Sequence, residues 1–335
     1  MIKKEFILFL LILCFELDVN SQGCSDPGLC TIGHLNSENT KDTLSGVDYK
    51  TSNIDELLSV KVVDEKFRLD LSSLYNQGEE STTILQFMVA LHMRINDKKS
   101  FVFRVPYSYI SGSLGSISNV GDITVGFQNI FSSNKNYQLA YVLGGIIPSN
   151  DANLKIDNNP LPMTYQTSLG LYNVFGGVSL VYKEWKFASG YQYSIGTNKN
   201  TFTTDNLVLI PSIPNYNPLN IDRVAYPSSK KLKRGSDLFF RIERRILIKK
   251  ISVFAGVLPI FRLSQSEISN SVGNRFKVKG SDGLTLNLNL AASYNVGKKW
   301  ILRANYGFPI QQREVRPDGL TRHFVGIFSI IYRSW

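Results

Sequence analysis

Arginine and acidic residues in this sequence recur at alternate positions in short segments. Arg241 and Glu243 stand two residues apart, so in a strand their side chains would point to the same face. Guanidinium groups on one face can bind anions, or they can pair with carboxylates where the face is buried. Eight residues of this kind form the candidate site: His92, Arg94, Arg104, Asp122, Arg241, Glu243, Arg262 and Arg303.

The three histidines do not indicate catalysis. An enzyme that works by nucleophilic attack needs a nucleophile and a base held together. His92 and Asp122 supply only half of such a set, and His34 and His323 stand in no recognisable motif. We therefore predict that the protein is not an enzyme and uses no metal and no cofactor. His92 is expected to join a hydrogen-bond network.

The segment Gly283–Tyr294, GLTLNLNLAASY, shows what kind of element carries these side chains. Its leucines fall on one parity and its threonine and asparagines on the other. Such alternation describes a strand with one apolar and one polar face, whereas on a helix the same residues would surround the axis. About twelve segments of this kind follow one another from Phe67 to the C-terminus, and the candidate site residues lie on their polar parity.

The connections between these segments alternate between short and long. Lys183–Glu184 is short, while Ser111–Val120, Ser149–Thr164 and Asn198–Arg234 are long. Short periplasmic turns and long extracellular loops are typical of outer-membrane barrels, which have an even number of strands and aromatic girdles. The sequence therefore predicts an all-β fold, an antiparallel transmembrane β-barrel of about 12 strands. In such a barrel the arginines of the candidate site could line one ring or ladder in the lumen.

Proline residues stand toward the outer ends of predicted strands, at Pro106, Pro148, Pro259 and Pro309. Proline cannot donate to the hydrogen-bond ladder of a sheet, so we predict that strand pairing ends at these positions. The alternative is a kinked wall with a lateral opening toward lipid.

The N-terminus has the features of an exported protein. Lys3 and Lys4 precede the apolar run Phe6–Phe15, and small residues before Gln22 fit a cleavage site. Residues 1–21 are therefore predicted to be a signal peptide.

The rest of the chain divides into two parts. Residues 22–56 are polar without a period, and they form either a periplasmic extension or a plug inside the barrel. Residues 57–335 form the barrel. Because exported chains meet oxidising conditions, a disulfide between Cys24 and Cys30 is the expected state.

The chain is basic, with 37 Lys and Arg against 27 Asp and Glu and a net charge of +10. A basic chain can meet nucleic acid, anionic lipid or an anionic solute, and export argues against nucleic acid. Its mean hydropathy of −0.07 fits a barrel, whose apolar residues alternate instead of forming runs. The basic run Lys230–Arg234 either binds lipopolysaccharide phosphates or is simply a solvated loop.

Two stretches resemble a known family. VPYSYISGSLGSISNVGDITVGFQNIF with GGIIPSND, and YNVFGGVSLVYKEWKFASGYQYSI, resemble bacterial outer-membrane channels named for a phenol-degradation (meta) pathway. These are broadly similar to the long-chain fatty-acid channel type. Pro106–Tyr107, Val120–Asp122 and Pro148 occupy the places of the family's motif, while Asn119 replaces a common glycine. The resemblance implies passive uptake of small, often apolar compounds.

These observations predict an outer-membrane channel of a Gram-negative bacterium for passive uptake of small solutes, either hydrophobic or anionic. The alternative is a non-transport barrel with a structural, surface-binding or assembly role. The expected partners are outer-membrane lipid, lipopolysaccharide, a small-molecule solute and the barrel-insertion machinery. We expect no nucleic acid, and we expect the protein to be a monomer.

Overall fold

A computed structural model describes residues 66–334, except 208, 210–216, 218–219, 249 and 320–322. The predicted signal peptide at 1–21, the segment 22–56 and the Cys24–Cys30 disulfide lie outside the described residues.

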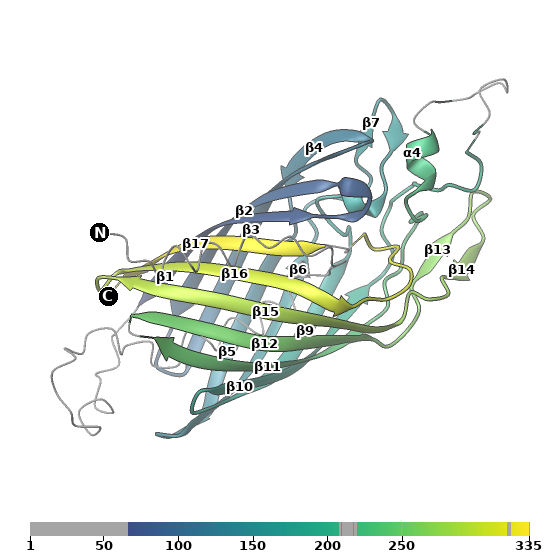
Figure 1. The fold of residues 1–335 in the computed structure, drawn as a ribbon. Helices are drawn as coiled ribbons and strands as arrows, with labels where there is room; N and C mark the ends of the chain where they lie inside the picture. Colours follow the sequence, from purple (N-terminus) through teal and green to yellow (C-terminus); the bar gives the residue numbers. More distant parts are fainter. Residues whose placement is uncertain are drawn as a thin grey trace.

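Twelve long strands form the wall of a closed antiparallel barrel (Figure 1), as predicted. Each strand pairs with the next one along the wall, and the last pairs with the first to close it. The wall strands are β1 (Phe67–Gln77), β2 (Thr83–Arg94), β3 (Lys99–Gly112), β5 (Ile123–Ser133), β6 (Tyr137–Ile147), β9 (Tyr172–Tyr182), β10 (Trp185–Ile195), β11 (Asp237–Ile248), β12 (Ile251–Arg262), β15 (Gly283–Val296), β16 (Trp300–Gln311) and β17 (Phe324–Ser334).

The shorter elements belong to the longer connections, which gather at one end of the barrel (Figure 1). We call this end the long-loop end and the opposite one the short-turn end. None of the described helices is long and apolar enough to span a membrane. The short elements are η2 (Glu79–Ser81), β4 (Gly115–Val120), β7 (Lys155–Ile156), β8 (Asn159–Pro160), η3 (Met163–Tyr165), α4 (Asn220–Val224), β13 (Glu267–Ser269) and β14 (Arg275–Lys277).

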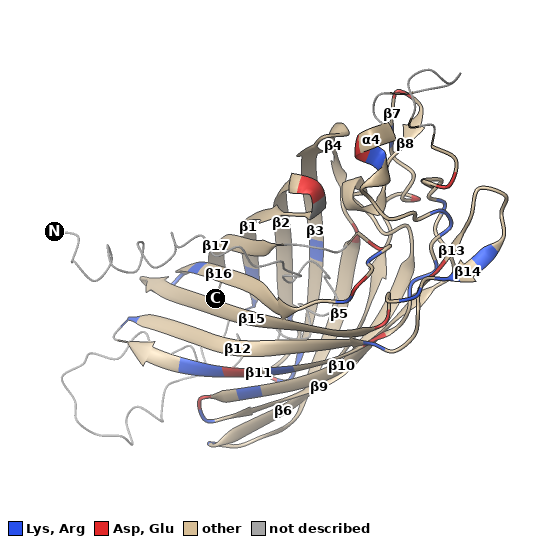
Figure 2. Cartoon of the chain, turned by 45° about the vertical axis from the view of Figure 1, so that its right-hand side comes forward, with Lys and Arg blue, Asp and Glu red and all other residues tan. Residues whose placement is uncertain are grey.

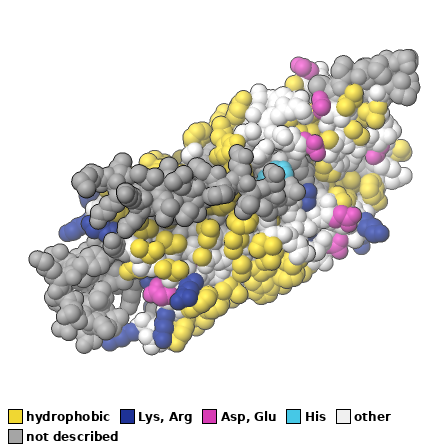
Figure 3. Space-filling model, viewed as in Figure 1, with side chains coloured by type: hydrophobic (Ala, Val, Ile, Leu, Met, Phe, Trp, Pro, Cys, Tyr) yellow, Lys and Arg dark blue, Asp and Glu magenta, His cyan; other side chains and the backbone are white. Residues whose placement is uncertain are grey.

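Side chains of the wall alternate between the outside and the lumen. In β3, Phe101, Phe103 and Tyr107 are exposed, while Val102 and Arg104 between them are buried. The same alternation in the other strands gives the barrel an outer surface dominated by apolar side chains (Figure 3). So large an apolar surface is expected only where lipid covers it.

The segment Ser111–Val120 was predicted to be a loop, and this is wrong for most of it. The half of β3 nearer the short-turn end pairs with β5, and the half nearer the long-loop end pairs with β4. The bulge Gly121–Asp122 connects β4 with β5, and the amide of Gly121 donates to the carbonyl of Pro106. A Cβ on Gly121 would lie 2.9 Å from the Cγ of Pro106. The missing side chain therefore makes room for the proline ring.

We predicted that strand pairing ends at the four prolines, and for three of them this is wrong. β3 continues past Pro106 and still pairs with β4, and β12 continues past Pro259 to Arg262 against β15. Pro309 lies at a register shift, beyond which Gln311 still pairs with Leu286 of β15. Pro148 directly follows the end of β6. A proline inside a wall strand is tolerated where its position requires no donated hydrogen bond.

Inside the wall, apolar residues from β3, β6, β9, β11 and β12 pack together in the lumen. The ring of Phe239 lies over Gly190 of β10, where a Cβ would come 2.5 Å from the phenyl Cζ. Because this glycine has no side chain, the aromatic ring can pack against the backbone of the neighbouring strand. The members of this lumen core are Val102, Val142, Ile146, Phe175, Phe239 and Leu258.

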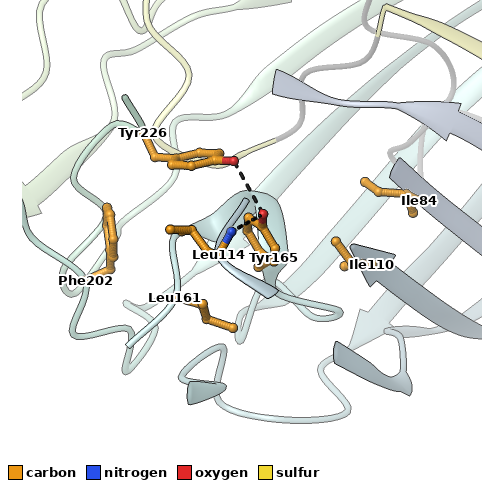
Figure 4. Packing of buried hydrophobic residues seen from close by; sticks show 7 residues of the cluster. All are labelled: Ile84, Ile110, Leu114, Leu161, Tyr165, Phe202 and Tyr226. Atoms are coloured by element: carbon orange, nitrogen blue, oxygen red, sulfur yellow. Dashed lines mark hydrogen bonds between the residues drawn. The ribbon is translucent and has the colours of Figure 1, made fainter. Parts of the chain in front are cut away.

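The loops at the long-loop end pack against one another and against the ends of β2 and β3 (Figure 4). The hydroxyl of Tyr165 accepts a hydrogen bond of 3.1 Å from the amide of Leu114, and it lies 3.5 Å from the hydroxyl of Tyr226. Phe202 and Leu161 complete this cluster beside wall residues of β2 and β3. The long loops therefore form a packed lid over the end of the barrel.

Candidate functional site

The eight candidate residues all come from the lumen side of the wall, but they lie at different heights. Seven of them are buried and Arg94, at the short-turn end of β2, is half-buried. They do not form one ring. Six of them belong to three groups that we call the inner cluster, the middle pair and the lid cluster, and Arg94 and Asp122 lie outside these groups.

The inner cluster lies toward the short-turn end, on β1, β2, β3, β16 and β17. Nε of Arg68 donates to Oδ1 of Asp70 at 3.0 Å, and Nε2 of His92 lies 3.2 Å from Oδ2 of the same carboxylate. Arg303 is close enough to act electrostatically on Arg68. The cluster as a whole consists of Arg68, Asp70, His92, Arg104, Arg303 and Arg333.

The middle pair consists of Arg241 and Glu243 on β11. Their side chains meet at 2.6 Å between Nη2 and Oε2. Lys186 of β10 is the register partner of Glu243, so a second cation faces the same carboxylate from the adjacent strand. Arg241 and Glu243 lie two residues apart on one strand, so each gives the other the opposite charge that a buried charge requires.

The lid cluster joins wall strands to the loops at the long-loop end, where Figure 2 shows basic and acidic residues close together. Asp318 Oδ2 lies 3.2 Å from Arg234 Nε, 3.0 Å from Arg262 Nη2 and 3.5 Å from Arg313 Nη2. Asp237 pairs with Arg234 at 2.7 Å and also binds Arg262. None of these five side chains is more than 3 % exposed.

The ionisation of the lid cluster follows from its composition. Burial alone would raise the pKa of Asp318, but Arg313, Arg262 and Arg234 outweigh it and hold the pKa well below its usual range. Burial lowers the pKa of Arg313 to about 10, which still leaves it charged at neutral pH. The cluster is therefore an ionic contact between three arginines and two aspartates, inaccessible to solvent.

Sequence reasoning missed Arg234, Arg313, Asp318 and Arg333 as members of these clusters. Arg313 and Asp318 lie in the connection between β16 and β17. In a loop, the alternation of a strand does not predict whether a side chain points into the lumen. Arg333 occupies an inward-facing position in the alternating pattern of β17, so the sequence pattern alone could have placed it in the lumen. In the basic run 230–234, Arg234 is buried and Lys230 donates to the carbonyl of Ser271.

Asp122 belongs to none of the three groups and holds a loop in place. Its Oδ1 accepts from the amide of Ser149 at 3.2 Å, and its Oδ2 accepts from the amide of Leu169 at 2.9 Å. The two amides come from opposite ends of the loop between β6 and β9. The carboxylate therefore fixes this loop against the bulge between β4 and β5.

We expect Asp122→Ala to loosen the loop between β6 and β9. Two backbone N–H groups would lose their acceptor, at about 1–3 kcal/mol each. Since about 1.4 kcal/mol is tenfold in an equilibrium, limited proteolysis should cut residues 148–171 about tenfold faster or more. The control is Asp151→Ala, an exposed residue of the same loop. Equal cleavage rates in the two variants would contradict this role for Asp122.

The wall, the apolar outer surface and the charged lumen together define the fold of an outer-membrane β-barrel. No family model matches the sequence, and no curated protein matches it. Among solved structures, an outer membrane channel from Pseudomonas putida F1 matches with a TM-score of 0.56 and 12% identity, over 81% of this chain and 96% of that one. At this identity the match shows the fold alone.

Two porins match more weakly. The NanC porin has a TM-score of 0.44 and 8% identity, over 80% of this chain and 100% of its own. The KdgM porin has a TM-score of 0.40 and 9% identity, over 80% and 99%. The fold assignment therefore rests on the match to the Pseudomonas putida channel. These comparisons show neither the phenol-degradation family nor the fatty-acid channel type.

Proposed function

We propose that this protein is an outer-membrane channel of a Gram-negative bacterium for the passive passage of small solutes. The observation that carries the proposal is the contrast between an apolar outer surface and a lumen lined with charged and polar side chains. Such a wall separates lipid from a polar interior, which is what a channel requires. The fold match to a channel supports the same function.

We propose further that the lumen favours anions. Among the described residues, the inner cluster has Arg68, Arg104, Arg303 and Arg333 around a single aspartate. In a lumen of low dielectric such charges act more strongly on a passing ion than they would in water. The lid cluster adds three arginines to two aspartates.

The charge of residues 22–56 supports their proposed role as a plug. This segment contains six acidic residues and two lysines. A negatively charged segment is complementary to a lumen with a surplus of arginine. Removing the segment should therefore both widen the path and leave the arginines more accessible to mobile anions.

The test is conductance in planar bilayers under a salt gradient. The full mature chain should prefer chloride over potassium, and the version lacking residues 22–56 should conduct about twofold more or better. An Arg104→Ala, Arg303→Ala variant should lose the anion preference. Arg262 is not a suitable target for this purpose, because its loss would disturb the lid cluster. Lys98→Ala, Lys99→Ala, at an exposed turn, removes the same charge outside the lumen and should change nothing.

The outcomes separate channel function from its electrostatics. Preference for cations in the full chain would contradict the role of the arginines and leave the channel in place. Absence of conductance in every version, together with absence of solute uptake by cells, would favour the non-transport alternative.

A further inference from the structure

Two of the cavities formed by the described residues bear on passage through the barrel, and the first lies under the lid. It has a volume of about 80 Å³ and is bounded by β1, β2 and β3 on one side and by the lid loops on the other. We call it the outer cavity. Leu74, Ile84 and Ile110 give it apolar walls, and Asn76 and Asp318 give it polar ones.

The second cavity lies deeper in the barrel, beside the middle pair. It has a volume of about 30 Å³ between β11 and the strands β15, β16 and β17, and we call it the inner cavity. Asn289 and Asn305 line it together with Gly307. Both cavities exceed the roughly 15 Å³ that one water molecule needs.

Val325 of β17 lines both cavities. Its register partners are Asn76 on β1, which lines the outer cavity, and Gly307 on β16, which lines the inner one. Gly307 has no side chain, so the wall beside Val325 is recessed. The side chain of Val325, 2% exposed, therefore stands between the two spaces.

The other half of the lumen is packed with apolar side chains. The lumen core fills it with side chains from β3, β6, β9, β11 and β12, including Phe239 and Leu258. A path from the lid toward the inner cluster therefore follows the inner faces of β16, β17 and β1.

Polar atoms along this path are buried without a hydrogen-bond partner in the described part of the chain. They are Oδ1 of Asn76 and Oδ1 of Asp318 at the outer cavity, and Nδ2 of Asn289 at the inner one. Buried polar groups of proteins are nearly always hydrogen-bonded. These acceptors and this donor suit water and small polar solutes, and they would be poorly satisfied by an alkyl chain.

We propose that small polar solutes cross the barrel along β16, β17 and β1, and that Val325 is the barrier between the two cavities on this path. The inference rests on the proposed channel function. It goes beyond that function because it names a polar route, the wall strands that form it and the side chain that limits it. A solute would pass the lid, occupy the outer cavity, displace Val325 and reach the middle pair.

The test is modification of a single cysteine in the conducting protein. Full mature chain carrying Cys24→Ser, Cys30→Ser and Val325→Cys is placed in a bilayer and treated with sulfonatoethyl methanethiosulfonate or its trimethylammonium counterpart. The thiolate displaces sulfinate and leaves a mixed disulfide in the path. Conductance should fall about fivefold or more with either reagent. Val325→Gly should instead raise conductance.

The matched control is Val142→Cys in the same cysteine-free background. Val142 also faces the lumen and is fully buried, but it belongs to the lumen core and lines neither cavity. The conductance of the Val142→Cys variant should not respond to either reagent. Heat-modified gel mobility of each variant verifies that the barrel has formed.

Two results would overturn the inference. In a protein that conducts, either a cysteine at position 325 that does not react or one that reacts without changing the current removes Val325 from the path. Both leave channel function intact. Failure of the unmodified parent to conduct at all would instead overturn the proposed function, and the two failures are thus distinguishable.

Discussion

Asp318→Asn should open the lid. The carboxylate contacts three arginines from three different segments. Removing its charge leaves Asp237 as the carboxylate of the lid cluster that still faces them. Breaking a buried ion pair by removing one partner costs about 3–5 kcal/mol. We expect the lid loops to detach while the wall remains closed, because the strand pairing does not depend on this side chain.

The measurement combines bilayer conductance with proteolysis of the lid loops. The variant should conduct more than the parent and should be cut faster between β12 and β15 and between β16 and β17. Asp157→Asn, an exposed aspartate on the loop between β6 and β9, is the matched control. A variant with the parent's conductance and the parent's cleavage rate would show that the lid does not depend on the cluster.

The depressed pKa of Asp318 predicts how the lid responds to acid. A carboxylate whose pKa is lowered on folding stabilises the folded state above its unfolded pKa, near 3.9, and loses this contribution only as pH falls toward the lowered value. The lid should therefore stay closed from neutral pH down to about 4.

Phe239→Ala should cost the barrel about 3–5 kcal/mol of unfolding free energy, because a large buried ring leaves a cavity behind. Phe239 is fully buried in the lumen core, and its ring fills the space over Gly190. Its neighbour Phe240 is 40 % exposed on the outer surface. Lipid tails can replace a ring lost from that surface, so Phe240→Ala should cost clearly less.

Comparing Phe239→Ala with Phe240→Ala tests which face of β11 points into the lumen, because both substitutions remove the same ring. Urea unfolding of both proteins in lipid vesicles gives the two free energies. Equal losses, or a larger loss for Phe240→Ala, would contradict the assignment of the lumen face.

The sequence predicted the wall because alternation carries most of the information about a barrel. In Gly283–Tyr294 the parity of leucine and asparagine states directly which residues face lipid. The same alternation could not show which cluster Arg262 joins. It predicts the face of the strand on which a side chain lies, but neither its position along the barrel axis nor its neighbour on the adjacent strand. Arg262 therefore joined the lid cluster and not a ring with Arg104 and Arg303.

The candidate site was harder to predict where loops contribute to it. Asp318 meets Arg234 across 84 positions in the chain, and no period connects them. The segment Ser111–Val120 was misjudged for a related reason. Its serines and glycines give no alternation of apolar residues, yet part of it pairs with β3 because the wall provides a ready edge.

The closing of the wall has a consequence for the order in which this protein can be built. β1 and β17 are neighbours, and Ser72 and Ser329 meet across the seam at 2.9 Å although 257 positions separate them in the chain. Asp318 lies shortly before β17. The segment from Asp318 through β17 thus provides both the strand that closes the wall and the carboxylate that binds the arginines of the lid cluster. Before this segment is in place, the barrel has an open seam between β1 and β16, and the lid loops lack the ionic contact with Asp318 and rest on their apolar cluster alone.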